Sequence, residues 1–442
     1  NNRSKSFRRL VFDELLANFL TLSENRKRIK KNKFPKQFNN DYVKKLINKL
    51  PFQLTNSQKK VLAEVNADLL SSNRMFRIIQ GDVGSGKTIV SLLAIVNVIT
   101  SGYQCALMSP TEILAKQHFE LTKRIFKKTN IKIDFLTGKT DYKERKKILA
   151  NLSNGKTELL IGTHTLFQKK ITFRKLGLAV IDEQHKFGVK QRSDLAIKGG
   201  NNCDVLLMSA TPIPRTMMMS LYGDMDISKI NEKPAKRKKI ITLSKPEKKI
   251  NELWPFVKKQ IDQDNQIFWV CPLIEESSIL DYSSAKKKFD LINKKFPNNV
   301  GLIHGSLDKI DKEKVLNKFL NKEISILVST TVIEVGIDFP DANLIVIENA
   351  NKFGLSQLHQ LRGRVGRGEK PATCILLFKE GLSKNAVKRI KILKNSDDGF
   401  YIAEEDLKLR GFGDITGYQQ SGMKNFRFAD PVIHEDLFKL AE

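Results

Sequence analysis

The sequence contains few cysteines and no long apolar run. Its four cysteines (Cys105, Cys203, Cys271 and Cys374) lie far apart, and no two of them form a C-x-x-C pair. This spacing excludes a disulfide framework and a cysteine-based zinc site, and it favours a reducing, cytoplasmic location. No apolar run approaches the roughly 18 residues that a transmembrane helix needs, so we expect no membrane partner.

A starting methionine is also absent, since the first residue is Asn1, and nothing at this end resembles a signal peptide. We therefore expect the chain to be part of a longer gene product. Its 442 residues suffice for about three domains of ~150 residues each. With 40% hydrophobic residues, the composition excludes a disordered protein.

Acidic residues are scarce. The chain has 48 of them against 77 lysines and arginines, which gives a formal net charge of +29. A polyanionic partner, meaning nucleic acid, would explain this excess. So would the composition of an AT-rich genome, since lysine, asparagine and isoleucine are abundant and arginine is not. Charge alone does not decide between a nucleic-acid partner and genome composition, so the decision rests on the motifs.

The chemistry is centred on a phosphate-loop motif, G-x-x-x-x-G-K-[ST], formed by Gly81, Asp82, Val83, Gly84, Ser85, Gly86, Lys87 and Thr88. An apolar run typical of a buried strand precedes it (75–79), and a segment with helical spacing follows (88–99). Glycines let the backbone wrap a triphosphate, lysine reaches the β- and γ-phosphates, and the threonine hydroxyl ligates Mg²⁺. The motif in this context predicts an ATP site.

Upstream of this loop lie a basic segment and a capped helix. Residues 7–22 have the broad apolar face of a helix that docks on a neighbour. For the basic connector at 26–36, we favour a solvated linker over a DNA contact. Thr55 is a plausible N-cap for the next helix. Gln58 could read the edge of adenine, although its chemistry alone favours a simple place in that capped helix.

After the loop, strands alternate with helices in short steps, which predicts a parallel sheet covered on both faces. The expected strands are 104–109, 131–136, 158–163, 178–182 and 205–209. Ligands bind at the carboxyl ends of such strands. Polar signatures follow four of them, beginning at Pro110, Gly162, Asp182 and Ser209.

Two of these signatures carry a specific hypothesis. Asp182 and Glu183 end a buried strand, where an aspartate would organise Mg²⁺ and a glutamate would polarise the attacking water. The alternative is an ordinary helix cap, which we disfavour downstream of a phosphate loop. Ser209 and Thr211 offer hydroxyls to His185 or to the acidic pair, whereas the alternative there is a turn, because two prolines follow.

Basic residues and a proline at 232–239 mark a linker, and a second alternating region follows. Strands are expected at 266–273, 300–304, 324–330 and 343–347, in a second parallel-sheet domain without a phosphate loop. Arg364 and Arg367 lie three residues apart among glycines, and they could reach a γ-phosphate as arginine fingers. A surface basic cluster is the alternative. The glycine-rich end, residues 380–442, is expected to pack against this second domain.

Taken together, the motifs resemble those of a superfamily 2 helicase, and more closely the bacterial RecG family. The likeness is carried by residues 52–58, 80–88, 110–118, 182–191, 208–215, 272–277 and 406–422, so it covers nearly the whole chain. It implies two tandem RecA-like parallel-sheet α/β domains with a C-terminal helical-hairpin and loop element for translocation. It further implies ATP-driven movement on branched double-stranded DNA in recombination and repair.

The resemblance also implies roles for individual residues. The ATPase residues would be Lys87, Thr88, Asp182, Glu183, Gln184, Arg364 and Arg367, with Gln58, Gly336 and Asp338 also at the nucleotide. Residues that couple hydrolysis to DNA would be Thr111, Thr163, His164, Arg389, Arg410 and Gln420. ATP and Mg²⁺ would be the cofactors. We expect a monomer, with single-strand DNA-binding protein as a further partner.

The chain departs from the family pattern in two ways. Nothing in it corresponds to the family's N-terminal wedge domain, so residues 1–48 resemble only the connector that follows the wedge. Tyr418 and Gln419 stand where the family usually has threonine and arginine. The expected division is thus a connector (1–48), a first RecA-like domain (49–234), a second (235–380) and a translocation region (381–442).

Three other functions remain alternatives. The motor of a transcription-repair coupling factor is disfavoured by Gln184 and by residues 52–58. An RNA helicase is disfavoured because such enzymes lack the element at 410–422. A nucleic-acid-binding scaffold that does not hydrolyse ATP is disfavoured because the chain retains Lys87, Asp182 and Glu183.

Overall fold

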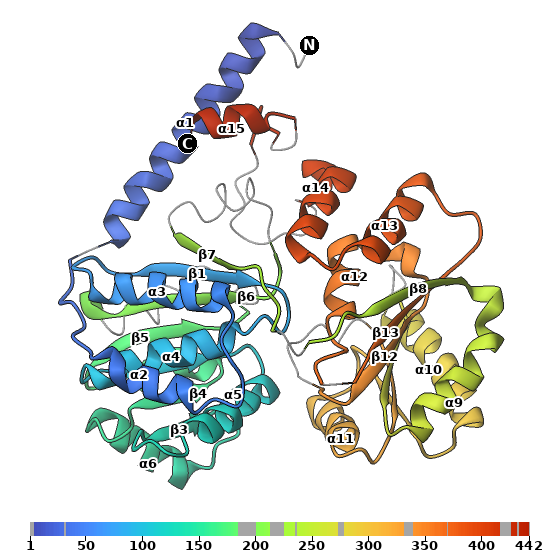
Figure 1. Cartoon of the computed structure of the whole chain (residues 1–442), viewed down its shortest axis with the longest axis horizontal. Helices are drawn as coiled ribbons and strands as arrows, with labels where there is room; N and C mark the ends of the chain where they lie inside the picture. Colours follow the sequence, from blue (N-terminus) through green and yellow to red (C-terminus); the bar gives the residue numbers. More distant parts are fainter. Residues whose placement is uncertain are drawn as a thin grey trace. The chain divides into compact units, whose positions relative to one another are not determined.

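The chain folds into two compact units, residues 1–234 with 410–442 and residues 235–409. The computed structural model describes residues 4–30, 32–183, 200–212, 225–234, 237–272, 278–330, 339–368, 370–415, 426–430 and 433–441. None of the helices in these ranges combines the length and the apolar composition that a membrane-spanning segment requires. Each unit is built on its own sheet (Figure 1).

The first unit contains a seven-stranded sheet in the order β3-β4-β2-β5-β6-β1-β7. Neighbouring strands in this sheet pair in parallel. The strands are β1 (Phe76–Gly81), β2 (Gln104–Met108), β3 (Ile133–Leu136), β4 (Leu159–Gly162), β5 (Leu176–Ile181), β6 (Asp204–Ser209) and β7 (Asp226–Ile230). Their carboxyl ends therefore meet at one edge, as the sequence predicts.

Helices cover both faces of this sheet, because successive strand residues point to opposite sides. Ile79 and Leu107 pack with helices on one face, whereas Ile78 and Ala106 contribute to a separate core on the other. The described helices are α2 (Asn40–Asn48), α3 (Asn56–Leu70), α4 (Lys87–Thr100), α5 (Glu112–Ile125) and α6 (Tyr142–Ser153), with short 3-10 turns η1 (His164–Phe167) and η3 (Gly200–Asn202).

The second unit contains a six-stranded sheet in the order β10-β11-β9-β12-β13-β8, again with parallel pairing throughout the described strands. Its strands are β8 (Ile241–Pro246), β9 (Gln266–Val270), β10 (Val300–Ile303), β11 (Ile326–Ser329), β12 (Ala342–Ile347) and β13 (Thr373–Phe378). The helices are η4 (Glu247–Leu253), α9 (Trp254–Asp262), α10 (Ser278–Lys295), α11 (Lys309–Leu320), η6 (Ala350–Lys352), α12 (Leu355–Arg362), α13 (Lys384–Asn395) and α14 (Gly399–Ile415).

The basic connector is not the solvated linker that the sequence suggests. Lys33 and Lys36 are fully buried, and both ammonium groups bind the carboxylate of Asp204 at the start of β6, at 2.8 and 2.5 Å. The same carboxylate accepts the backbone N–H of Met75 at 2.7 Å. Burial lowers the pKa of Lys33 even though the charge of Asp204 acts in the opposite direction. Two cations and one buried anion thus attach the connector to the sheet.

The end of the chain packs on its beginning, which corrects the expectation that all of 380–442 packs on the second domain. Helices α1 (Lys5–Ile29) and α15 (Glu435–Ala441) lie against each other (Figure 1). Val11 and Leu15 are buried with Phe438. The Glu14 carboxylate accepts the backbone N–H groups of residues 427–429. The apolar face expected on the first helix is therefore covered by residues more than 400 positions away.

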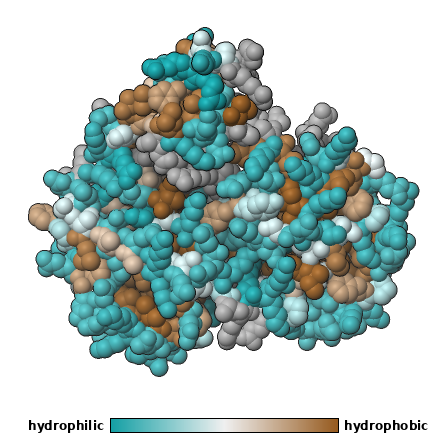
Figure 2. All heavy atoms as spheres, turned by 45° about the horizontal axis from the view of Figure 1, so that its top comes forward, coloured by the Kyte–Doolittle hydropathy of each residue, from teal (hydrophilic) through white to brown (hydrophobic). Residues whose placement is uncertain are grey.

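Part of the surface of this helix pair stays apolar. Leu10, Leu20 and Leu440 are exposed, and Figure 2 shows apolar atoms gathered at the top of the view, where α1 and α15 lie. By contrast, α13 packs on α12 and β8 within the second unit. The C-terminal region is therefore divided between the two units.

Candidate functional site

The phosphate loop joins β1 to α4 and has the backbone that its glycines predict. Gly84 and Gly86 have φ angles of 76° and 90°, in the left-handed region that glycine adopts without strain. A Cβ atom on Gly86 would lie 2.2 Å from Nε2 of Gln58, so a side chain there would also clash. Helix α4 begins without a side-chain cap, and an uncapped helix N-terminus is a ready-made anion site.

Two side chains of the loop direct hydrogen-bonding groups into it. Lys87 is only 8% exposed, and its ammonium donates to the carbonyls of Gly81 and Asp82, at 2.7 and 2.9 Å. The hydroxyl of Ser85 is buried and has no hydrogen-bond partner among the described residues. A phosphate oxygen would accept from both groups, so the residues present fit a nucleotide.

Gln58 links the helix before the sheet to the phosphate loop. Its side chain closes a capping box with Thr55, accepting that residue's N–H at 2.9 Å. Its Nε2 donates to the carbonyl of Ser85 at 2.7 Å. The capped helix considered in the sequence analysis is therefore present. A contact of Gln58 with adenine stays a prediction.

The acidic pair lies where β5 ends, at the same edge of the sheet as the loop. Asp182 and Glu183 are both buried, and Glu183 has a φ of 48°, a conformation that is strained for a residue with a side chain. The N–H of Glu183 donates to Oδ1 of Asp182 at 2.9 Å. Backbone strain of this kind clusters at functional sites.

His118 was missed as a site residue by the sequence analysis. Its Nε2 lies 2.8 Å from Oδ2 of Asp182. Burial alone would raise the pKa of the Asp182 carboxyl, but the hydrogen bond and charge of His118 and the charge of Lys87 outweigh burial and lower it. A signal was present, because His118 lies between Ala115 and Thr122 on the buried stripe of α5. A polar residue on such a stripe needs a buried partner.

Three of the residues predicted to couple to DNA, Thr111, Thr163 and His164, also lie at this edge of the first sheet. Thr111 caps α5 by accepting the N–H of Leu114 at 3.3 Å. Thr163 is buried with its hydroxyl 3.1 Å from that of Thr165, whereas His164 is exposed at the start of η1. At the end of β6, the Ser209 hydroxyl pairs with that of Thr211 at 2.8 Å.

Three of the predicted arginines, Arg364, Arg367 and Arg389, belong to the second unit. Arg364, just past α12, is 2% exposed. Arg367 is partly exposed, with Nε 3.4 Å from the carbonyl of Gly363. Arg389 on α13 donates to the backbone carbonyls of Phe353 and Asn351, at 2.7 and 3.4 Å. Its guanidinium thus joins α13 to the end of η6.

Several predicted positions fall outside the residues that the structure describes. These are Gln184, His185, Gly336, Asp338 and Gln420, together with the side chain of Arg410. In the described part of the chain, no group of three or more histidine, cysteine, aspartate or glutamate side chains could hold a metal ion. A Mg²⁺ site at Thr88 and Asp182 stays a prediction; Mg²⁺ usually binds through one or two protein groups, phosphates and water.

Three family models match the chain. The DEAD/DEAH box helicase model covers residues 55–220, the helicase conserved C-terminal domain covers 248–369, and the model named ATP-dependent DNA helicase RecG, domain 3, C-terminal, covers 396–438. The last match spans parts of both structural units, including α14 and α15.

Curated relatives extend this similarity over nearly the whole chain. The chain is 45% identical to ATP-dependent DNA helicase RecG of Bacillus subtilis over 97% of its length, covering 63% of that protein. It is also 45% identical to RecG of Thermotoga maritima over 99% of its length, covering 56% of that protein. The chain therefore spans about six tenths of the length of these relatives.

Solved structures show the same relation. The chain superposes with a TM-score of 0.84 on a structure titled RecG bound to three-way DNA junction, at 40% identity, covering 99% of this chain and 57% of the other. Against S. cerevisiae Dbp5 bound to RNA and ADP BeF3, the TM-score is 0.59 at 17% identity, over 85% of this chain and 99% of the other. The second likeness shows the fold alone.

Proposed function

This chain belongs to the RecG family of ATP-dependent DNA helicases, and from that premise we propose that it hydrolyses ATP to move along double-stranded DNA. Branched DNA, such as stalled forks and Holliday junctions, is the proposed substrate. The observation that carries the proposal is the shared edge of the first sheet. There the phosphate loop, the acidic pair and the predicted DNA-coupling threonines follow parallel strands.

The proposed ATPase chemistry uses the buried groups of this edge. Lys87 would leave its two carbonyl partners to bind the phosphates, and Thr88 and Asp182 would hold Mg²⁺, which neutralises phosphate charge when bound. Glu183, set by its strained backbone, would orient and polarise the attacking water. Gln58 would contact adenine, and Gln184 would assist at the phosphates.

The second unit would complete the ATPase and transmit its state to DNA. Arg364 and Arg367 are proposed to stabilise the charge that develops on the γ-phosphate. Gly336 and Asp338 would also contact the nucleotide. Coupling to DNA is assigned to residues at element ends and in the translocation region, namely Thr111, Thr163, His164, Arg389, Arg410 and Gln420. We further propose that the protein is a cytoplasmic monomer and that it binds single-strand DNA-binding protein.

The test is ATP hydrolysis by this chain with duplex, single-stranded and forked DNA, and with RNA as control. We expect strong stimulation by DNA that weakens as salt rises, because phosphate contacts release counterions. A preference for forked DNA would support the branched substrate. Stimulation by RNA alone would contradict the proposal, and a lack of stimulation by every nucleic acid would favour a scaffold.

We assign His118 the role of a positioning residue for Asp182. His118→Ala should lower the ATP turnover rate by about tenfold to a hundredfold, because a hydrogen bond to a charged group is worth roughly 1.5–3 kcal/mol. The Mg²⁺ concentration needed for half-maximal rate should rise as well. Steady-state hydrolysis over a Mg²⁺ series measures both effects.

Lys116→Ala is the matched control, since Lys116 is exposed on the same helix. It should leave the turnover rate and the Mg²⁺ dependence unchanged. The positioning role is wrong if His118→Ala lowers only the thermal stability and its hydrolysis depends on Mg²⁺ in the same way as that of Lys116→Ala.

A further inference from the structure

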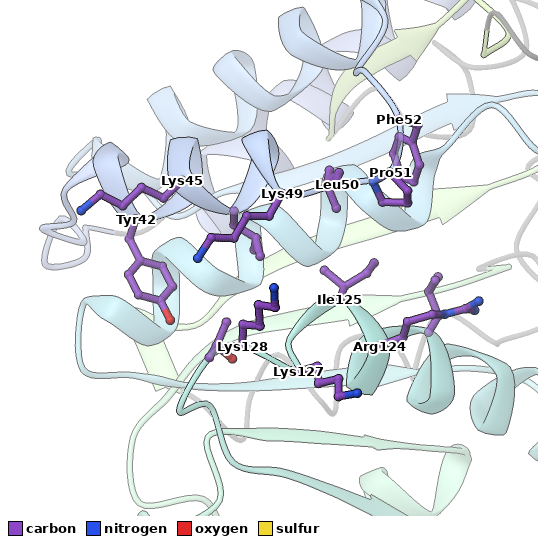
Figure 3. Close-up of a pocket in the computed structure, with 13 residues that line it drawn as sticks. Tyr42, Lys45, Lys49, Leu50, Pro51, Phe52, Arg124, Ile125, Lys127 and Lys128 are labelled. Atoms are coloured by element: carbon purple, nitrogen blue, oxygen red, sulfur yellow. The ribbon is translucent and has the colours of Figure 1, made fainter.

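A hollow of about 390 Å³ lies on the first unit (Figure 3). One side is formed by α2 and the segment that follows it, and the other by the last turns of α5 and the segment that follows that helix. Its floor is aliphatic, because Leu46, Leu50, Leu121 and Ile125 line it. Of these, Leu46 is buried, and the other three are partly buried against the core of the sheet. The hollow would therefore take an apolar group of side-chain size.

Five cationic side chains line the same hollow, namely Lys45, Lys49, Arg124, Lys127 and Lys128, and no carboxylate does. All five are exposed, and none forms an ion pair or a side-chain hydrogen bond with the residues that the structure describes. In Figure 3, Lys49 and Lys128 extend toward each other from opposite sides. Like charges that line one hollow repel one another, and an anionic ligand would relieve that repulsion.

The hollow is separate from the nucleotide site. Helix α5 starts beside the carboxyl ends of the strands, just after Thr111, and Arg124 to Thr129 lie at its other end. With 14 residues, α5 places its two ends about 20 Å apart. None of the residues assigned to ATP or to DNA coupling lines the hollow, so its cations are not explained by the proposed function.

We propose that this hollow docks an acidic peptide segment of a partner protein. A large apolar side chain of the segment would fill the aliphatic floor, and flanking carboxylates would face the five cations. The duplex backbone offers phosphates but no apolar group that could enter. Single-stranded bases would need aromatic platforms, and the two rings here, Tyr42 and Phe52, stand at opposite ends of the hollow (Figure 3).

The proposal is tested with a fluorescein-labelled peptide in which aspartates flank a leucine–phenylalanine pair. Fluorescence anisotropy should show that this peptide binds the unmodified chain. A control peptide with lysines in place of the aspartates should not bind. Replacing the apolar pair by serines should also weaken binding. Lys49→Glu combined with Lys128→Glu should lower the affinity for the aspartate peptide by about tenfold or more, because two attractive charge pairs become repulsive.

Two controls separate this surface from general charge. Lys60→Glu combined with Lys146→Glu changes the net charge equally at exposed sites away from the hollow, and it should leave the affinity unchanged. Tyr42→Ala, at the rim, should lower the affinity for the aspartate peptide without altering DNA-stimulated ATP hydrolysis. The ATP hydrolysis measurement distinguishes failure of this docking proposal from failure of the proposed motor function.

Two outcomes would overturn the proposal. One is that the aspartate peptide binds the unmodified chain and both double variants with the same affinity, or binds none of them. The other is loss of single-stranded oligonucleotide binding in the Lys49→Glu and Lys128→Glu variant while the peptide binds no chain at all. The hollow would then be a nucleic-acid site.

Discussion

Lys87→Ala should lower ATP hydrolysis by about two to three orders of magnitude, the usual effect of removing one preorganised group that stabilises transition-state charge. The structure shows how the loop holds this group. Lys87 is the cation that the loop itself holds at 2.7 and 2.9 Å from two of its own carbonyls, in a buried position. Its ammonium is thus held inside the loop before any nucleotide arrives, and it would exchange these carbonyls for phosphate oxygens.

The measurement is the steady-state rate at saturating ATP with duplex DNA present, together with the affinity for a fluorescent nucleotide. Lys87→Arg should also be slow, because the planar guanidinium does not reproduce the compact ammonium that would bind the phosphates as a point charge. Lys59→Ala, at an exposed lysine of α3, should retain the full rate. A Lys87→Ala chain that hydrolyses ATP at the rate of this control would contradict the assignment of the phosphate loop.

Asp204→Ala should destabilise the first unit by about 3–5 kcal/mol, the usual cost of leaving buried charge without its partner. Asp204 is fully buried, and its carboxylate holds Lys33, Lys36 and the N–H of Met75. Without it, two ammonium groups would remain in an apolar interior. The connector before α2 should detach from the sheet as a result.

The position of the two tryptophans makes this measurement specific. Trp254 and Trp269 both lie in the second unit, and the chain contains no others. Urea unfolding followed by far-ultraviolet circular dichroism reports both units, whereas tryptophan fluorescence reports the second alone. Asp204→Ala should therefore shift the dichroism transition to lower urea and leave the fluorescence transition in place.

Asp13→Ala is the control, because Asp13 pairs with Arg9 at the exposed surface, where such pairs contribute about 0–1 kcal/mol. Asp204→Asn should fall between the two variants, since an amide oxygen still accepts the N–H of Met75. If Asp204→Ala unfolds at the same urea concentration as Asp13→Ala, the buried charge cluster does not stabilise the unit.

Much of the fold followed from local patterns. Continuous apolar runs mark the central strands, and helical spacing marks the segments between them, so the parallel sheets were predicted and are confirmed. The edge strands β7 and β8 were missed, because their apolar residues alternate with polar or charged ones over a short length. Strand β13 was missed although its apolar run, Cys374 to Leu377, resembles those of the strands that were found.

The candidate site shows the same division. Residues 81–88 form a local motif, so the sequence identified the phosphate loop with its glycines, its lysine and its threonine. The pairing of His118 with Asp182 joins residues 64 positions apart. No spacing rule connects them, because the distance between α5 and the end of β5 is set by how the helix packs on the sheet.

The sequence by itself determined the two parallel sheets, the phosphate loop and the edge at which the polar residues gather, because short-range periodicity and backbone requirements decide these features. Only the tertiary structure decided which charges are buried and which are left for a ligand. Lys33 and Lys36 find Asp204 about 170 residues away, while Lys49 and Lys128, equally basic in sequence, find no carboxylate among the described residues. Charge pairing over such separations depends on the packing of the whole unit, which no local pattern encodes.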